Sequence, residues 1–365
     1  MLDSALKILG ELTSHSYKAY IVGGFVRDYL LGIESKDIDI CTNATPKEIK
    51  EIFEDSCLPN EDYGSVVVER YGIRFEITTF RREIEYNDQR RPIEIKYIDD
   101  LYEDLLRRDF VINTLCMDEN GKVLDYLGGR EDLDNKIIRT IGKAFDKFNE
   151  DPLRILRAIR FSTIFNFQLD KEVKQAIIDT KSLLKNLSYN RKKEELDKIF
   201  TSPNYKYGIK LLLELGLDKE LEIYNLSSAL NSMFTSSIGI WSILNVCDKY
   251  PFNKNETELI DKINKVLELD VFDKKVLYKY GLYVCSVACE IKDLDIKKIT
   301  EEYNTLIIKS RDDIDIDSDT IMMILGKAPG KYLKDIYDDI EGKILYGELD
   351  NKKEVICKYI IDKYK

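Results

Sequence analysis

Apolar and polar positions along the first 140 residues follow two different spacings. Residues 2–12 repeat apolar side chains at helical intervals, which predicts an amphipathic helix. Residues 20–22 are a short apolar run that ends at a glycine pair, and residues 37–41 alternate acidic and apolar side chains. These two runs predict strands, the first buried and the second half-buried. The front of the chain is therefore expected to mix helices with a sheet.

Turn and capping signals predict the other elements of this part. They are a helix over 25–31 ended by Gly32, a helix that opens at Thr45-Pro46, a hairpin of 65–71 and 74–80, an Arg-rich loop over 81–92, and a second hairpin of 110–117 and 122–126. From Asp151 onward the spacing is mostly helical, with helices expected over 151–166, 171–184, 190–200 and 204–216. We place a domain boundary near residue 145.

Composition and charge narrow the class of protein. The chain has 365 residues, 44% of them hydrophobic, so it can bury cores for two or three domains and disorder is excluded. No apolar run is long enough to span a membrane, and the first residues lack a secretion signal, so a cytoplasmic protein is expected. His15 is the single histidine, and the seven cysteines are scattered. A His-rich metal site is thereby excluded, and free thiols are expected.

The arginines are distributed unevenly. Fifteen of the sixteen lie between Arg27 and Arg191, whereas lysines continue to the end of the chain. The planar guanidinium matches phosphate oxygens and base edges better than an ammonium does. The front half therefore has the composition of a phosphate-binding region, although the net charge of the whole chain is −11.

The sharpest local motif combines a glycine pair with two carboxylates. Gly23 and Gly24 separate a predicted strand from a predicted helix, where backbone N–H groups can approach an anion, and Arg27 lies on that helix. Asp37 and Asp39 are two positions apart on a strand, so their side chains project from one face. Paired carboxylates together with substrate phosphates are typical ligands of Mg²⁺. The motif differs from a P-loop and from a dinucleotide-binding fingerprint.

Several segments in the same order give the chain a family resemblance. YIVGGFVRDYLLGIESKDIDICTNATPKEI resembles the first motif of the tRNA nucleotidyltransferase (CCA-adding) and bacterial poly(A) polymerase family. The resemblance continues through RFEITTFRREIEYNDQRRP, LLRRDFVINTLCMD, LDYLGGREDLDNKIIRTIG and EDPLRILRAIRF, over roughly residues 15–200. It implies an α+β fold, in which a polymerase-β-like nucleotidyltransferase head with a mixed sheet precedes an all-helical neck, body and tail. On this basis we assign residues 1–145 to the head, 146–205 to the neck, and 206–365 to the tRNA-binding body and tail.

The resemblance also implies roles for residues of the head. Asp37 and Asp39 would hold two Mg²⁺ against the triphosphate and the attacking 3′-hydroxyl. Glu76 matches a third acidic residue, with a plain strand-surface acid as the alternative. Gly23, Gly24 and Arg27 match phosphate-contacting positions, and Arg108 matches a nucleotide-binding arginine. Asp109 would accept a hydrogen bond from the ribose hydroxyl.

The segment EDPLR resembles a protein template that reads the incoming base. Asp151 and Arg154, expected three apart on one helix, would hydrogen-bond to its Watson–Crick edge, with Glu150 orienting the arginine. Arg157 and Arg160 would contact the triphosphate. Asn190-Arg191 belongs to a weaker last motif, expected to brace the neck.

Three activities are compatible with this family. A full enzyme adds CCA to the 3′ end of tRNA from CTP and ATP, a partial enzyme adds only CC or only A, and a poly(A) polymerase extends RNA with A. The resemblance implies that CC-adding members have a shortened loop between the first two motifs. The corresponding stretch 81–92 is complete here, which favours full CCA addition, although Gln89 replaces a residue that is often His in the family. A long basic tail is lacking, and 312–317 is an acidic run instead, which disfavours poly(A) synthesis. An inactive RNA-binding relative and a small-molecule nucleotidyltransferase are weaker alternatives.

Overall fold

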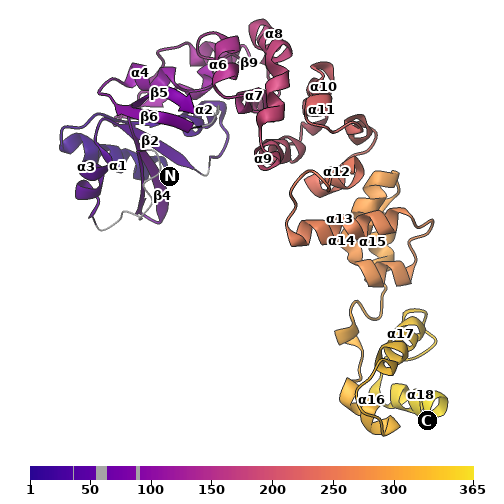
Figure 1. Cartoon of the computed structure of the whole chain (residues 1–365). Helices are drawn as coiled ribbons and strands as arrows, with labels where there is room; N and C mark the ends of the chain where they lie inside the picture. Colours follow the sequence, from indigo (N-terminus) through magenta and orange to yellow (C-terminus); the bar gives the residue numbers. More distant parts are fainter. Residues whose placement is uncertain (36, 55–63, 88–90) are drawn as a thin grey trace. The chain divides into compact units, whose positions relative to one another are not determined.

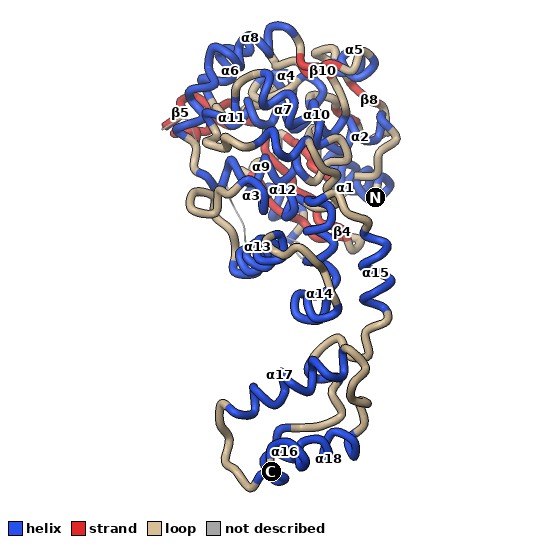
Figure 2. The backbone as a smooth tube through the Cα atoms, turned by 90° about the vertical axis from the view of Figure 1, so that its right-hand side faces the viewer, coloured by secondary structure: helices blue, strands red, loops and turns tan. Residues whose placement is uncertain are grey.

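The computed structural model describes residues 1–35, 37–54, 64–87 and 91–365. The chain divides into two compact units, Met1–Tyr224 and Asn225–Lys365. Every strand among the described residues belongs to the first unit, and the second consists of helices and connecting loops (Figures 1 and 2). Within the described parts of the chain, no helix is both long and apolar enough to cross a bilayer.

A six-stranded sheet forms the centre of the N-terminal region, with strand order β3-β4-β2-β1-β7-β8. Its strands are β1 (Ala19–Val22), β2 (Ile38–Thr42), β3 (Ser65–Arg70), β4 (Ile73–Thr79), β7 (Cys116–Met117) and β8 (Val123–Leu124). The β2–β4 pair is parallel and the other pairs are antiparallel. The expected mixed sheet is confirmed. Apolar side chains at its centre, such as Ile21 and Phe75, are fully buried.

Three short helices pack on this sheet where the sequence predicts them: α1 (Leu2–Ser14), α2 (Gly24–Leu31) and α3 (Pro46–Ile52). Gly32 ends α2 in the left-handed conformation. Thr45 begins α3 with a capping box, in which its side chain and that of Glu48 satisfy each other's backbone N–H groups. The strand–glycine pair–helix–strand order of the first motif is therefore built by local signals.

Two predictions for this region are wrong. Residues 81–92 are not a loop, because β5 (Arg81–Asn87) and β6 (Arg91–Tyr97) pair as an antiparallel hairpin, while Gln89 lies outside the described residues. The sequence there alternates charged with β-branched or aromatic residues, and its high charge hid that strand pattern. Residues 110–117 were expected to form one strand, but Val111–Asn113 is a 3₁₀ turn. Asp109 and Thr114 bond to nearby backbone groups there, which competes with strand pairing.

The rest of the first unit is largely helical. Its helices are α4 (Leu101–Leu106), α5 (Gly129–Asp134), α6 (Ala144–Glu150), α7 (Leu153–Phe165), α8 (Lys171–Thr180), α9 (Tyr189–Phe200), α10 (Tyr205–Glu214) and α11 (Leu217–Glu220). A short parallel pair joins β9 (Ile137–Ile138) to β10 (Gln168–Leu169). Helix α7 packs against α9 and α10, and a Cβ on Gly208 of α10 would lie 2.4 Å from the Thr163 hydroxyl of α7. That glycine permits the close helix contact.

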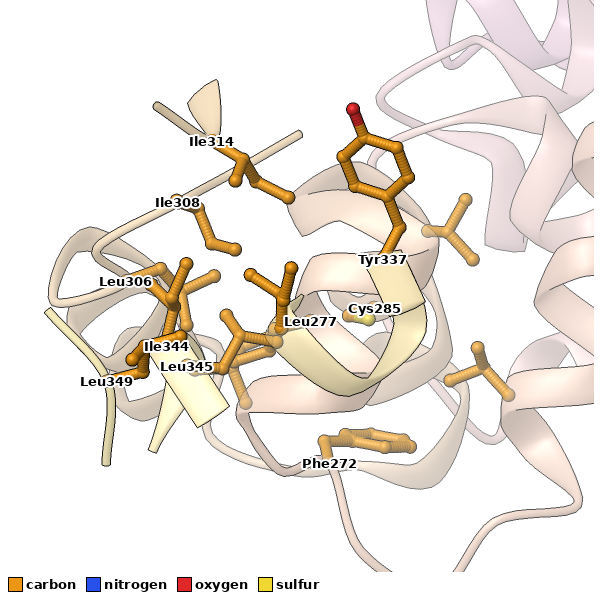
Figure 3. Close-up of a cluster of buried hydrophobic side chains, with 14 of the residues drawn as sticks. Phe272, Leu277, Cys285, Leu306, Ile308, Ile314, Tyr337, Ile344, Leu345 and Leu349 are labelled. Carbon is orange, nitrogen blue, oxygen red and sulfur yellow. The ribbon is translucent and has the colours of Figure 1, made fainter. Parts of the chain in front are cut away.

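The second unit contains α12 (Ser237–Leu244), α13 (Lys254–Leu267), α14 (Lys274–Lys292), α15 (Ile296–Asn304), α16 (Ser318–Leu325), α17 (Tyr332–Leu345) and α18 (Lys353–Tyr364). Their apolar faces share a core that includes Leu277, Cys285 and Ile344 (Figure 3). The acidic run 312–317 has a structural role, because Asp315 and Asp317 accept hydrogen bonds from the first backbone N–H groups of α18 and α16, while the isoleucines between the acids are buried.

Candidate functional site

Three carboxylates gather on one face of the sheet. Asp39 of β2 is directly opposite Glu76 of the parallel strand β4, and both residues keep exposed surface, although the carboxyl group of Asp39 is partly enclosed by its neighbours. Asp37 precedes β2 by one residue. Partial burial and the nearby Glu76 and Asp37 carboxylates raise the pKa of Asp39, whereas Arg108 opposes them. This crowding of negative charge is the property expected of a cation site.

The glycine pair brings a guanidinium and a carboxylate to the same point. Gly23 has a φ of 71° and precedes α2, so glycine is favoured there. A Cβ at this position would lie 3.4 Å from Nη1 of Arg108 and 3.7 Å from Oδ2 of Asp39. A Cβ on Gly24 would lie 3.4 Å from Nη2 of Arg27. Backbone, carboxylate and arginines thus converge at the start of α2.

The residues present fit a divalent cation held partly by substrate. Among the residues that the structure describes, no group of three or more His, Cys, Asp or Glu is assembled to hold a metal. Asp37 and Asp39 offer hard oxygen ligands, and two carboxylates leave coordination positions for phosphate oxygens and water. The arginines beside them suit the same phosphates.

A buried carboxylate that sequence reasoning missed supports Arg108. Asp104 of α4 is fully buried, and its Oδ2 accepts from Nη2 of Arg108 at 3.3 Å. Its Oδ1 accepts from Nε of Arg107 at 2.8 Å and from the backbone N–H of Arg81 at 3.1 Å. Asp104 precedes Arg107 by three residues and Arg108 by four, and this helical spacing is the signal that could have identified it.

A chain of contacts joins Arg27 to Arg157. Nη1 of Arg27 donates to Oδ1 of Asn113 at 2.5 Å, and Nδ2 of Asn113 donates to Oδ1 of Asp109 at 3.1 Å. Oδ2 of Asp109 accepts from Nε of Arg157 at 2.7 Å. Burial alone would raise the pKa of Asp109, but Arg157 and Asn113 hold it below its ordinary value. Asp109 is therefore an ionised, buried acceptor, and Asn113 links it to Arg27.

One aromatic ring organises three of the predicted arginines. The guanidinium carbons of Arg27, Arg157 and Arg160 lie 5.3, 5.5 and 4.4 Å from the ring centroid of Phe161. Arg160 is buried and paired with Glu195 at 2.9 Å, and burial, reinforced by Arg157, lowers its pKa to about 10. Arg157 keeps 32% of its side chain exposed, which makes it the more accessible of these two for a ligand.

The predicted base-reading pair lies at the junction of α6 and α7. Asp151 is in extended conformation between the two helices, so the expectation that it shares one helix with Arg154 is wrong. The reason is Pro152, which favours an extended residue before it, and the Asp151 carboxylate caps α7 by accepting from Leu153 N–H. Asp151 also contacts Arg191 at 3.4 Å, so the last motif braces this carboxylate.

Three known protein families match successive parts of this chain. Residues 19–139 match the family described as "Poly A polymerase head domain", residues 166–222 the "Probable RNA and SrmB- binding site of polymerase A", and residues 229–360 domain 2 of tRNA nucleotidyltransferase.

Relatives match over nearly the whole chain. A CCA-adding enzyme of Geobacillus sp. (strain WCH70) is 36% identical, covering 98% of this chain and 96% of its own, and that of Bacillus subtilis (strain 168) is 34% identical, covering 98% and 97%. The crystal structure of the Bacillus stearothermophilus CCA-adding enzyme in complex with CTP aligns with a TM-score of 0.86 at 28% identity, covering 98% and 96%. The predicted family and fold are thereby confirmed, and this chain belongs to the family of CCA-adding tRNA nucleotidyltransferases.

Proposed function

We propose that this protein adds CCA to the 3′ end of tRNA, using CTP and ATP. The proposal rests on one observation: the first unit contains both the carboxylate face with Asp39 and the Asp151–Arg154 pair that follows α6. The relatives that match the full length are named CCA-adding enzymes, and one of them binds CTP. We also propose a cytoplasmic location, which a tRNA substrate supports.

The head would bind the triphosphate and the reacting groups. Asp37 and Asp39 would hold Mg²⁺, which neutralises phosphate charge and lowers the pKa of the 3′-hydroxyl, and Glu76 stands beside them on the parallel strand. The backbone at Gly23 and Gly24 lets phosphate oxygens approach the start of α2. Arg108, whose side chain is 17% exposed beside Gly23, supplies a charged fork at the same place.

The arginines around Phe161 would hold the rest of the nucleotide. Hydrogen bonds connect Arg27 and Arg157 through Asp109 and Asn113. A shift of the residues that contact phosphate would therefore also shift the residue that contacts the ribose. Asp109 accepts a ribose hydroxyl only if it shares oxygens already bonded to Arg157 or Asn113. Arg160, whose guanidinium carbon lies 4.4 Å from the centroid of the Phe161 ring, adds positive potential.

The pair after α6 would choose the base. Asp151 accepts from the exocyclic amine of C or A, and U and G present no amine at the matching position. Arg154 donates to a ring nitrogen or carbonyl acceptor. Glu150 accepts from Nη1 of Arg154 at 2.6 Å, which limits the rotation of the guanidinium.

Incubation with tRNA lacking its 3′ CCA and each labelled nucleotide tests the proposal. Two C residues followed by one A are expected, with no UMP or GMP. Addition that stops after CC, addition of A alone to tRNA ending in CC, or a long A tail would each replace the proposal with another member of the family. Asp39→Ala is the matched inactive control for these reactions.

A further inference from the structure

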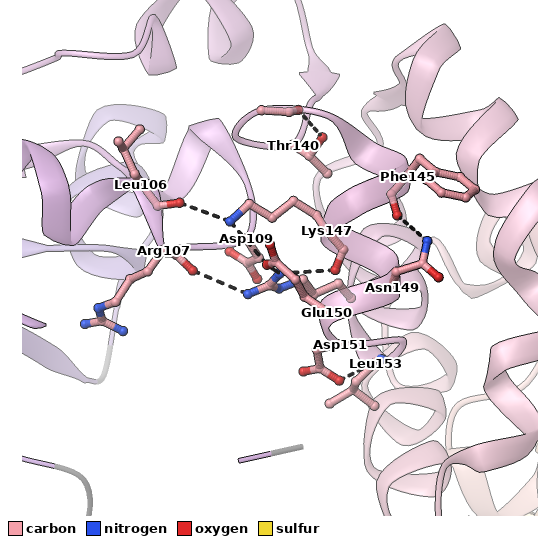
Figure 4. A network of polar contacts seen from close by, with 12 residues as sticks. Leu106, Arg107, Asp109, Thr140, Phe145, Lys147, Asn149, Glu150, Asp151 and Leu153 are labelled. Atoms are coloured by element: carbon pink, nitrogen blue, oxygen red, sulfur yellow. Dashed lines mark hydrogen bonds and ion pairs between the residues drawn. The ribbon is translucent and has the colours of Figure 1, made fainter. Parts of the chain in front are cut away.

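Lys147 of α6 joins the base-reading segment to the end of α4. Its Nζ donates to the carbonyl oxygen of Leu106 at 3.1 Å and lies 3.4 Å from Oε2 of Glu150 (Figure 4). Only 13% of its side chain is exposed. This lysine belongs to none of the groups assigned above to triphosphate, cation or base.

The same lysine contacts Arg154 directly through its backbone carbonyl, and its side chain is linked to Arg154 through Glu150. Nη1 of Arg154 donates to Oε2 of Glu150 at 2.6 Å and to the Lys147 carbonyl at 3.1 Å. Nη2 of Arg154 is 3.4 Å from the Arg107 carbonyl. Figure 4 shows the Leu106 carbonyl directed toward the Lys147 ammonium.

The C-terminal end of α4 attracts both cations. Its last carbonyls lack partners within the helix and carry the negative end of the helix dipole. Arg107 is followed at once by Arg108 and Asp109, so a cation docked there is placed relative to the nucleotide-binding residues. Lys147 therefore sets the spacing between α6, which leads into the template, and the residues that hold the nucleotide.

Lys147 and Arg154 both form ion pairs with the carboxylate of Glu150. The carboxylate oxygen lies between an ammonium and a guanidinium, so its attraction is shared by two cations. If the ammonium is lost, Glu150 pairs with Arg154 alone and the contact between α6 and Leu106 is broken. The Glu150–Arg154 pair, already in contact at 2.6 Å, is then no longer tied to Leu106 by Lys147, and the angle of Arg154 toward a bound base changes.

We propose that Lys147 is a positioning residue for base choice, holding Arg154 in reading geometry by docking α6 on the last carbonyls of α4 and sharing Glu150. The inference rests on the proposed function, in which Arg154 reads the base. A guanidinium at position 147 can satisfy the same contacts, whereas a thioether of similar length cannot.

The test compares Lys147→Met, Lys147→Gln and Lys147→Arg in the full-length protein. kcat/KM for a single addition is measured with CTP, UTP and GTP on tRNA lacking CCA, and with ATP, UTP and GTP on tRNA ending in CC. Lys147→Met is expected to raise the use of UTP and GTP relative to CTP and ATP about tenfold, equivalent to about 1.4 kcal/mol. Lys147→Arg is expected to keep the wild-type ratio within about twofold. Asn149→Ala is the control on the same helix, because the Asn149 amide donates to Phe145 and not to the template.

Arg154→Ala, assayed in parallel, separates the possible failures. If Arg154→Ala relaxes base choice but the Met and Gln variants both keep it, the inference about Lys147 is overturned and the template stands. If Arg154→Ala still excludes UTP and GTP, the template proposal fails, and the inference fails with it. A uniform loss with all four nucleotides would show that Lys147 only supports the fold, and if Lys147→Met does not fold, the Gln variant decides.

Discussion

Replacing Asp104 with alanine removes a single carboxylate on which three donors converge. Its oxygens accept from Nε of Arg107, Nη2 of Arg108 and the Arg81 backbone N–H, at 2.8, 3.3 and 3.1 Å. The Asp104 side chain is wholly buried, and those of the two arginines are each 17% exposed. The substitution therefore leaves cationic groups in a poorly solvated place without their shared acceptor.

The magnitude follows from the number and burial of these contacts. A hydrogen bond to a charged group contributes about 1.5–3 kcal/mol, and removing one partner of a buried ion pair costs about 3–5 kcal/mol. The contacts share one carboxylate and do not add independently. We expect Asp104→Ala to lower the free energy of unfolding of the first unit by about 3–5 kcal/mol. Asp100→Ala, which removes an exposed cap of the same helix, is expected to cost about 1 kcal/mol.

The assay must report on the unfolding of the first unit, which contains α4. Trp241 is the only tryptophan, and it lies in Asn225–Lys365, so its fluorescence does not report on α4. Urea unfolding is best followed by hydrogen exchange of peptides from α4 and β1, with Trp241 emission as an internal control that should not shift. Because Arg108 loses its support beside Gly23, KM should rise for CTP and ATP alike.

Two results would refute this reasoning. A loss below about 1 kcal/mol would show that the arginines find other acceptors, contrary to the burial argument. An equal shift of the Trp241 transition would show that the effect is not confined to the first unit.

Other substitutions test the remaining parts of the site. Asp39→Ala should abolish incorporation of CMP and AMP while nucleotide binding remains detectable by equilibrium dialysis; retained turnover would contradict the cation assignment. Phe161→Leu should raise KM for CTP and ATP by a similar factor of about 10, since an arginine–ring contact contributes about 1–2 kcal/mol when desolvated; unchanged KM values would contradict a role for the ring in placing the arginines. Because the pKa of Asp109 is lowered by Arg157, its stabilising effect is present above the unfolded pKa of about 4 and is lost as pH falls through the folded value. Asp109→Asn should accordingly flatten the fall in stability below pH 4–5 in acid titrations followed by circular dichroism, and an unchanged slope would exclude Asp109 as its source.

Local signals determined most of the first motif. The glycine pair, the Thr45 cap and the alternation at 37–41 each act over a few residues, so strand, turn, helix and strand were predicted in order and confirmed. The hairpin at 81–97 is not predicted because its many charged residues are typical of a loop. The alternation of charged with β-branched or aromatic residues is nevertheless the pattern of a strand.

Only the tertiary structure decided which charges meet. The sequence by itself determined the family, the mixed sheet and the arginine-rich front half, because motifs and periodicity are properties of neighbouring residues. The pairing of Asp39 with Glu76 across two strands and the hydrogen bond of Lys147 to Leu106 join segments some 40 residues apart, and nothing in local spacing specifies them. They arise because strand register and helix docking are set by burial of the whole apolar surface, and polar side chains then pair with whatever that packing brings within reach.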